Sequence, residues 1–229
     1  MFTCYQSLST LPTHHSSLLD RLNVVIENNN TKVNDYLVEY RNDIKKVKRK
    51  FDICDKELIG DVILKRNKQK NGEWLEIKFN CDAEVIDFDD DDGYDRILNL
   101  LERAEEKHLD YSDKLALGEE KQGIEVDVYI IKGGERLTFH CIASDKFVIQ
   151  KVYFDSPISL AGDTLELKKL YSGPKYVNLE EPLRDALQRY LKKRLVDDFL
   201  STFIFNYSRL KREKEFTHWA EHMKTILSN

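Results

Sequence analysis

Apolar side chains recur at helical spacing near the N-terminus of the chain. Over residues 16–51 they fall at heptad-like steps, which alternate between four and three residues from Val33 to Phe51. Three consecutive asparagines at 28–30 interrupt this pattern, and Thr31 is a residue type that caps helix N-termini. We therefore predict helix over residues 16–51, divided at the asparagines.

Strict alternation of apolar and polar residues predicts strands in the middle of the chain. Asn71-Gly72 and Gly133-Gly134 separate neighbouring strands with the residue pairs that favour tight hairpins. The expected strands cover residues 61–67, 73–80, 123–131, 135–142, 147–154 and 164–171. Hairpin connections imply an antiparallel sheet with one buried face. A long insert, residues 81–122, separates the second and third of these strands, and part of it has helical character.

Three apolar stripes at helical spacing follow from residue 179 onward. We interpret all three as core-facing. Their residues are Leu183, Leu187, Tyr190 and Leu191; then Phe199, Leu200, Phe203, Ile204 and Tyr207; then Phe216, Trp219, Met223, Ile226 and Leu227. The order of helix, antiparallel sheet and helices predicts an α+β fold.

The chain length of 229 residues suits one domain, which we place at residues 16–229. Residues 1–15 contain no acid and several Ser and Thr, so we expect a leader remnant or a disordered N-terminus. The four cysteines lie far apart without a C-x-x-C pair, which argues against zinc ribbons and fits a reducing compartment. No apolar run is long enough to span a membrane.

Acidic side chains gather at one place in the insert. The net charge is −5, but residues 82–95 alone carry −8 without a single base, so the remainder sums to +3. The eight acids are Asp82, Glu84, Asp87, Asp89, Asp90, Asp91, Asp92 and Asp95. Neither register of an EF-hand loop fits, although a looser divalent-cation site stays open. Mutual repulsion favours a solvated, mobile loop, and we predict that these acids form a partner-binding surface.

The basic run "KKVKRK" at residues 45–50 admits two interpretations. It can be a nuclear-import or nucleic-acid patch, or a solvated helix face whose cations suit the helix C-terminus. The acidic cluster repels phosphates, so we expect nucleic-acid binding to be weak or indirect, through a basic partner.

One motif has the form of a catalytic site. His218, Glu221 and His222 match H-x-x-E-H, which places two imidazoles on one helix face for zinc and a glutamate to activate water. A third ligand is expected well downstream in that class, and only seven residues remain. Phosphate-binding glycine loops and nucleophile elbows do not occur in the sequence. We therefore predict no catalytic, cofactor-binding or metal-binding residues.

The C-terminal half resembles the mitochondrial acidic matrix protein family, also called the mitochondrial glycoprotein family, which includes the animal receptor for complement globular heads. The matching residues are Tyr171, Gly173, Pro174, Leu179, Leu187, Leu191, Phe203, Lys214, Glu215, Phe216 and Trp219. Upstream, Leu137, Phe139 and Cys141 match the paired strands of the family. The family usually has glycine where this chain has Leu195, so the turn after residue 194 is expected to differ.

The resemblance implies a strongly twisted antiparallel sheet of about six or seven strands, flanked by an N-terminal helix and C-terminal helices, in a doughnut-shaped homotrimer. It also implies a non-enzymatic adaptor or chaperone-like scaffold of the mitochondrial matrix, without a cofactor. Its expected partners are basic proteins or ribonucleoprotein assemblies, in support of mitochondrial translation, ribosome assembly or oxidative phosphorylation. A permanent subunit of a large mitochondrial complex and a zinc hydrolase remain the alternatives.

Overall fold

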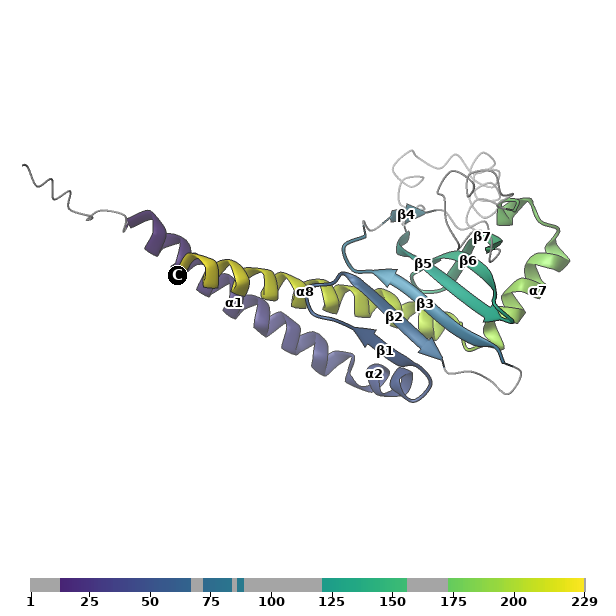
Figure 1. Ribbon diagram of the computed structural model, residues 1–229, viewed down its shortest axis with the longest axis horizontal. Coiled ribbons are helices and arrows are strands. Elements are labelled where there is room, and N and C mark those ends of the chain that lie inside the picture. Colours follow the sequence, from purple (N-terminus) through teal and green to yellow (C-terminus); the bar gives the residue numbers. More distant parts are fainter. Residues whose placement is uncertain (1–12, 67–71, 84–85, 89–120, 156–172, 229) are drawn as a thin grey trace, which may run out of the picture.

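The computed structural model describes residues 13–66, 72–83, 86–88, 121–155 and 173–228. Two helices come first, then the strands, then a short 3₁₀ turn and two more helices (Figure 1). The elements are α1 (Thr13–Glu39), α2 (Arg41–Lys48), β1 (Asp52–Asp55), β2 (Asp61–Arg66), β3 (Trp74–Asn80), β4 (Ile86–Phe88), β5 (Lys121–Lys132), β6 (Glu135–Ala143), β7 (Phe147–Asp155), η1 (Tyr176–Asn178), α7 (Glu181–Lys192) and α8 (Asp198–Ser228). This order confirms the α+β prediction.

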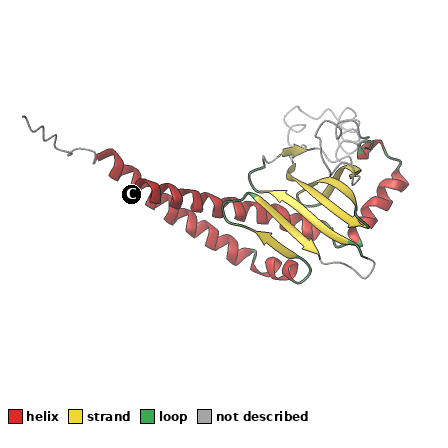
Figure 2. Ribbon diagram, in the orientation of Figure 1, coloured by secondary structure: helices red, strands yellow, loops and turns green. Residues whose placement is uncertain are grey.

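The strands form one twisted antiparallel sheet in the order β1-β2-β3-β5-β6-β7, and β4 pairs with β5 (Figure 2). The predicted Gly133-Gly134 hairpin is confirmed. Both glycines have positive φ, 62° and 88°, which the tight turn between β5 and β6 requires and which a side chain would disfavour. The strand predicted at 164–171 and the helical part of the insert lie outside the described residues.

The buried face of the sheet packs against α8, which crosses it. The ring centroids of Phe79 on β3 and Tyr207 on α8 lie 6.4 Å apart, edge to face. At the other end of the sheet, the Phe139 ring stacks on Tyr190 of α7 at 6.3 Å. The core therefore lies between one sheet face and the C-terminal helices, as the first two C-terminal stripes predict, except that Leu183 and Phe199 are 48% and 38% exposed. No described helix combines the length and apolar character needed to cross a bilayer.

Helix α1 runs beside α8, and the pair extends beyond the sheet as a two-helix arm (Figure 1). The predicted division at the asparagines is wrong, since α1 continues from Thr13 to Glu39. Asn29 is only 3% exposed, and its Nδ2 donates to Glu213 O at 2.6 Å and to Thr217 Oγ1 at 2.9 Å. This amide joins the helix to α8 instead of ending it. The break comes later, at Tyr40, before α2.

The interpretation of the third apolar stripe as core is also wrong. Phe216, Trp219 and Ile226 are 43%, 52% and 73% exposed. Helix α8 continues beyond the edge of the sheet, so among the described elements only α1 lies beside its last turns (Figure 1). The spacing of the stripe is helical, but within the described chain no second layer covers this face.

The turn between α7 and α8 is left-handed at Leu195, a conformation that favours glycine. This residue has a φ of +66°, in the left-handed region. Leu195 N donates to Lys192 O at 3.0 Å and Val196 N donates to Leu191 O at 3.2 Å, which is the Schellman pattern that ends helices. Leucine therefore ends the helix here in the way that glycine commonly does. The conformation costs roughly 1 kcal/mol for leucine, and packing of the partly buried Leu195 side chain against the core offsets that cost.

Candidate functional site

The acidic cluster begins at the end of β3. Asp82 is exposed directly after this strand. Asp87 lies in β4, opposite Gln122 of β5, so the prediction of a continuous loop is wrong at this residue. The alternation of Ile86, Asp87 and Phe88 is the period-2 signal that sequence reasoning missed beside so much charge. The remaining members, Glu84, Asp89, Asp90, Asp91, Asp92 and Asp95, lie outside the described residues, as does the possible cation site among them.

Arg212 of α8 fixes the chain where the acidic cluster starts. Its Nε donates to Cys81 O at 2.7 Å and its Nη2 donates to Ala83 O at 3.1 Å. Cys81 N also donates to Gly60 O at 2.9 Å, which ties the same point to the β1–β2 turn. Sequence analysis did not single out Arg212, because it lies more than a hundred residues from the carbonyls it holds. The acidic segment therefore begins at a point of the chain that hydrogen bonds hold in place.

A polar cluster lies on the other face of the sheet, beside β3. Asp127 and His140 are directly opposite on β5 and β6, with 2.9 Å between Asp127 Oδ1 and His140 Nδ1. Tyr129 Oη donates to Asp127 Oδ2 at 3.0 Å, and Glu125 Oε1 lies 3.8 Å from His140 Nε2. These groups line a pocket of about 250 Å³ that also reaches Asp61. His140 therefore has a cross-strand role in the sheet.

The contact with Asp127 changes the protonation of both partners. Its hydrogen bond with His140 raises the pKa of that imidazole, and this outweighs the opposing effect of burial. Burial tends to raise the pKa of Asp127, but the hydrogen bonds from His140 and Tyr129 leave it lowered. The dyad has the form of a general base, yet among the described residues that line its pocket there is no Ser, Thr or Cys to serve as a nucleophile.

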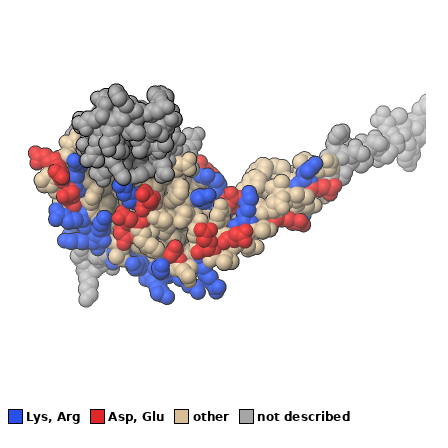
Figure 3. Space-filling model, turned by 180° about the vertical axis from the view of Figure 1, so that it is seen from behind, with Lys and Arg blue, Asp and Glu red and all other residues tan. Residues whose placement is uncertain are grey.

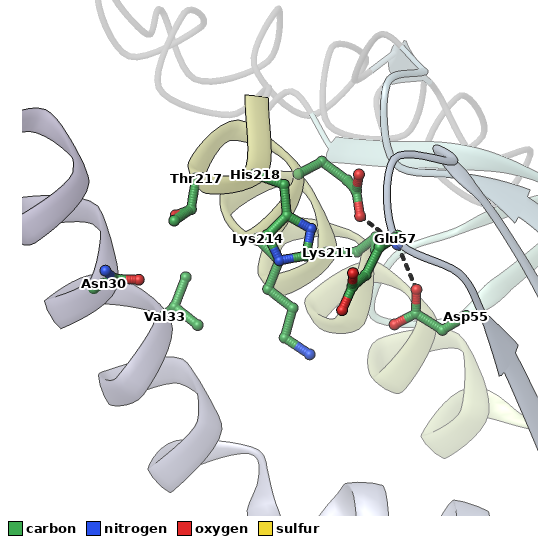
Figure 4. A pocket seen from close by; sticks show the side chains of 9 residues that line it. Asn30, Val33, Asp55, Glu57, Lys211, Lys214, Thr217 and His218 are labelled. Atoms are coloured by element: carbon green, nitrogen blue, oxygen red, sulfur yellow. Dashed lines mark hydrogen bonds and ion pairs between the residues drawn. The ribbon is translucent and has the colours of Figure 1, made fainter. Parts of the chain in front are cut away.

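A second pocket, of about 350 Å³, lies where the two-helix arm meets the sheet (Figure 4). Lys211 forms one wall, and its side chain is 2% exposed. Its Nζ lies 2.5 Å from Asp55 Oδ1 and from Glu215 Oε1, and it donates to Lys56 O at 2.6 Å. Tyr207 Oη donates to the other Asp55 oxygen at 2.7 Å.

These contacts make Lys211 a structural ion-pair centre that ties α8 to the end of β1. Burial tends to lower the pKa of Lys211, but its bonds to the two carboxylates raise it above the ordinary value of 10.5. The amine is therefore charged at neutral pH and does not supply a nucleophile.

The geometry of His218, Glu221 and His222 gives little support to the alternative of a zinc hydrolase. His218 is half-buried and lines the pocket beside Lys214, whereas Glu221 and His222 are exposed on the outside of α8. Among the described residues, no three His, Cys, Asp or Glu side chains are grouped as a metal site requires. The third ligand that catalytic zinc needs is thus not provided by the part of the chain that the structure describes.

The fold and these sites define an α+β protein with a single antiparallel sheet, a helical arm and a localised acidic cluster. The sequence profile of the mitochondrial glycoprotein family MAM33 matches residues 17–227, and the chain belongs to this family. Membership assigns it to the mitochondrion.

Individual relatives agree with this assignment. The mitochondrial acidic protein mam33 of Schizosaccharomyces pombe is 35% identical over 101 residues, which are 42% of this chain and only 38% of that protein. A Leishmania major protein described as a homologue of human p32 has a similar fold, with a TM-score of 0.54 and 18% identity over 78% of this chain and 83% of its own. The Trypanosoma brucei p22 protein gives a TM-score of 0.53 and 18% identity over 86% and 99%. These two structures confirm the expected fold.

Proposed function

We propose that this protein is a non-enzymatic acidic adaptor or chaperone-like scaffold of the mitochondrial matrix. It binds basic proteins or ribonucleoprotein assemblies in support of mitochondrial translation, ribosome assembly or oxidative phosphorylation. The observation that carries the proposal is the segment from residue 82 to 95, which contains eight acidic residues and no basic one. Arg212 holds the start of this segment through the carbonyls of Cys81 and Ala83. Such concentrated charge attracts basic partners and raises their association rate.

Assembly into a homotrimer is part of the proposal. Apolar side chains stand exposed on both helices of the arm, including Val24 at 52%, Val38 at 77% and Trp219 at 52%. Apolar surface of this kind is typical of protein contacts. Three copies bring 24 acidic residues of the cluster together, by multiplication of the eight in each chain. Light scattering is expected to give three times the chain mass of 27.0 kDa, and a stable monomer at micromolar concentration contradicts the assembly.

The direct test replaces Asp87, Asp89, Asp90, Asp91, Asp92 and Asp95 with Asn. Capture of a basic protein should weaken strongly, and the steep loss of wild-type binding with rising salt should flatten, because exposed charges are screened within about 8 Å at physiological salt. The melting temperature should stay nearly unchanged or rise slightly, since like charges repel.

A matched control removes six exposed acids elsewhere: Asp20, Glu27, Asp35, Glu180, Asp185 and Glu221, each replaced by its amide. It changes the net charge by the same amount, so binding that falls equally in both variants reflects net charge alone and refutes the assigned surface. Sedimentation of a native extract separates an adaptor from a permanent subunit. A free trimer supports the adaptor, whereas quantitative co-migration with a large particle supports the subunit.

A further inference from the structure

A second charged surface, of opposite sign, lies on α2 and the corner between α7 and α8. We call it the α2–α7 basic surface. It comprises the exposed residues Lys45, Lys46, Lys48, Arg49, Lys50 and Lys192. Figure 3 shows Lys and Arg side chains gathered along the lower and left margins of the body, on the side where α2 and α7 lie. The sequence alone shows the run at 45–50, but not its neighbour from α7.

Phe199 joins the two parts of this surface. The Nζ of Lys46 lies 5.2 Å from the centre of the Phe199 ring, which is 38% exposed in the first turn of α8. The preceding residue, Asp198, pairs with Lys192 at 3.5 Å. Lys46 of α2 therefore lies over the exposed ring, and Lys192 of α7 pairs with the residue next to it in the chain.

Most of this positive charge is not neutralised within the described chain. Asp43 pairs with Lys46 at 3.1 Å, and both side chains are largely exposed. No ion pair with a described carboxylate engages Lys45, Lys48, Arg49 or Lys50. The helix dipole favours cations near the C-terminus of α2, but it does not neutralise their charge. A role at the helix end therefore leaves this charge available to an anionic partner.

Asp87, the member of the acidic cluster that lies in β4, is too far away to cancel this surface. The strand registers place Asp52, which follows the basic run, in one row across the sheet with Lys65, Glu76 and Tyr129. Asp87 is level with Gln122, seven residues back along β5 from Tyr129. At about 3.3 Å per residue this offset is about 23 Å, well beyond the screening length of about 8 Å. The charge of Asp87 is therefore screened at residues 45–50, whereas the repulsion of phosphates by the members outside the described residues stays a prediction.

We propose that the α2–α7 basic surface binds single-stranded nucleic acid, with Lys45, Lys48, Arg49 and Lys50 on phosphates and a base stacked on Phe199. A single strand presents one phosphate per nucleotide and an aromatic face on every base, which matches clustered cations around an exposed ring. An anionic membrane also matches this charge, and binding to anionic vesicles is therefore one of the outcomes that the test distinguishes. This inference is independent of the acidic cluster and extends the proposed adaptor to two oppositely charged surfaces.

The proposal predicts how strongly salt weakens the binding of nucleic acid. For single strands, the slope of log K against log salt is about −0.7 per phosphate contact. Four contacts, from Lys45, Lys48, Arg49 and Lys50, predict a slope of about −2.8. Raising the salt from about 50 to about 200 mM should then weaken binding about 50-fold.

The test measures the fluorescence anisotropy of a labelled oligouridylate, with the full chain at a series of salt concentrations. The variant K45Q/K48Q/R49Q/K50Q should lose the slope and nearly all binding. The control R21Q/K32Q/K56Q/K224Q removes the same charge from exposed positions outside the surface and should keep both. Phe199→Leu should weaken binding at least about fivefold with an unchanged slope, because stacking does not release counterions. If the quadruple variant melts early, K45Q/K48Q should halve the slope.

Four results overturn the proposal. They are absence of wild-type binding at low salt, equal losses in the quadruple and control variants, competition by polyglutamate as strong as by unlabelled RNA, and binding to anionic vesicles without binding to RNA. Capture of a basic protein by the quadruple variant should match wild type. That measurement separates failure of this surface from failure of the acidic adaptor.

Discussion

Lys211→Met tests whether the ion-pair centre beneath the arm stabilises the fold. The wild-type amine is 2% exposed, and three oxygens, on Asp55, Glu215 and the Lys56 carbonyl, lie within 2.6 Å of it. Methionine fills a similar volume but leaves two largely buried carboxylates, 17% and 13% exposed, without their counter-charge. Breaking a buried pair by removing one partner costs about 3–5 kcal/mol. For a chain of this size, that corresponds to a fall of about 6–20 °C in melting temperature.

The assay is urea unfolding followed by circular dichroism at fixed protein concentration, because any assembly makes stability depend on concentration. Lys214→Met is the matched control, on the same helix but only half-buried, and it should change the unfolding free energy by no more than about 0.5 kcal/mol. Adding Asp55→Asn and Glu215→Gln to Lys211→Met should restore part of the loss, since neutral groups tolerate burial better.

The pH dependence has a definite sign. The pKa of Lys211 is raised in the folded protein, so its contribution is complete below the ordinary value of 10.5 and is lost only as the pH rises through the higher folded value. A cost of less than about 1 kcal/mol for Lys211→Met at neutral pH, or a cost equal to that of Lys214→Met, would refute the structural role assigned to this residue.

Three further outcomes are expected. Asn29→Ala should lower the unfolding free energy by about 1–3 kcal/mol, because Glu213 O and Thr217 Oγ1 lose a buried donor. The control Asn30→Ala, at an exposed site, should be nearly neutral. Equal denaturation midpoints for the two variants would contradict the role assigned to Asn29. The raised pKa of His140 adds stability that is complete below about pH 6.5 and fades as the pH rises through the folded value, so the melting temperature of His140→Gln should lose that part of its pH dependence between about pH 5.5 and 8. The six-aspartate variant should melt at or slightly above the wild-type temperature, and early melting would show that these acids hold structure, for instance around a cation.

The sequence predicted those features of the fold that depend on neighbours along the chain. Period-2 alternation located β3, β5 and β6, because a half-buried strand must present apolar side chains to one face only. The Gly133-Gly134 pair predicted the hairpin because the turn needs positive φ at both residues. The acidic cluster can likewise be read directly from the sequence, and so can the family signature near the C-terminus.

Tertiary structure decided the features whose partners lie far away in the chain. Asn29 is a residue type that disfavours the interior of a helix. It stays helical because its side-chain amide donates to Glu213 O, 184 residues later in the chain. Lys211 lies in a charged stretch typical of a solvated face, but α8 carries it onto Asp55, more than 150 residues away, and buries it. Helical periodicity showed that Trp219 belongs to an apolar stripe, whereas only the position of α8 beyond the sheet leaves that side chain exposed. Local spacing fixes which residues share a face, and burial depends on what packs against that face.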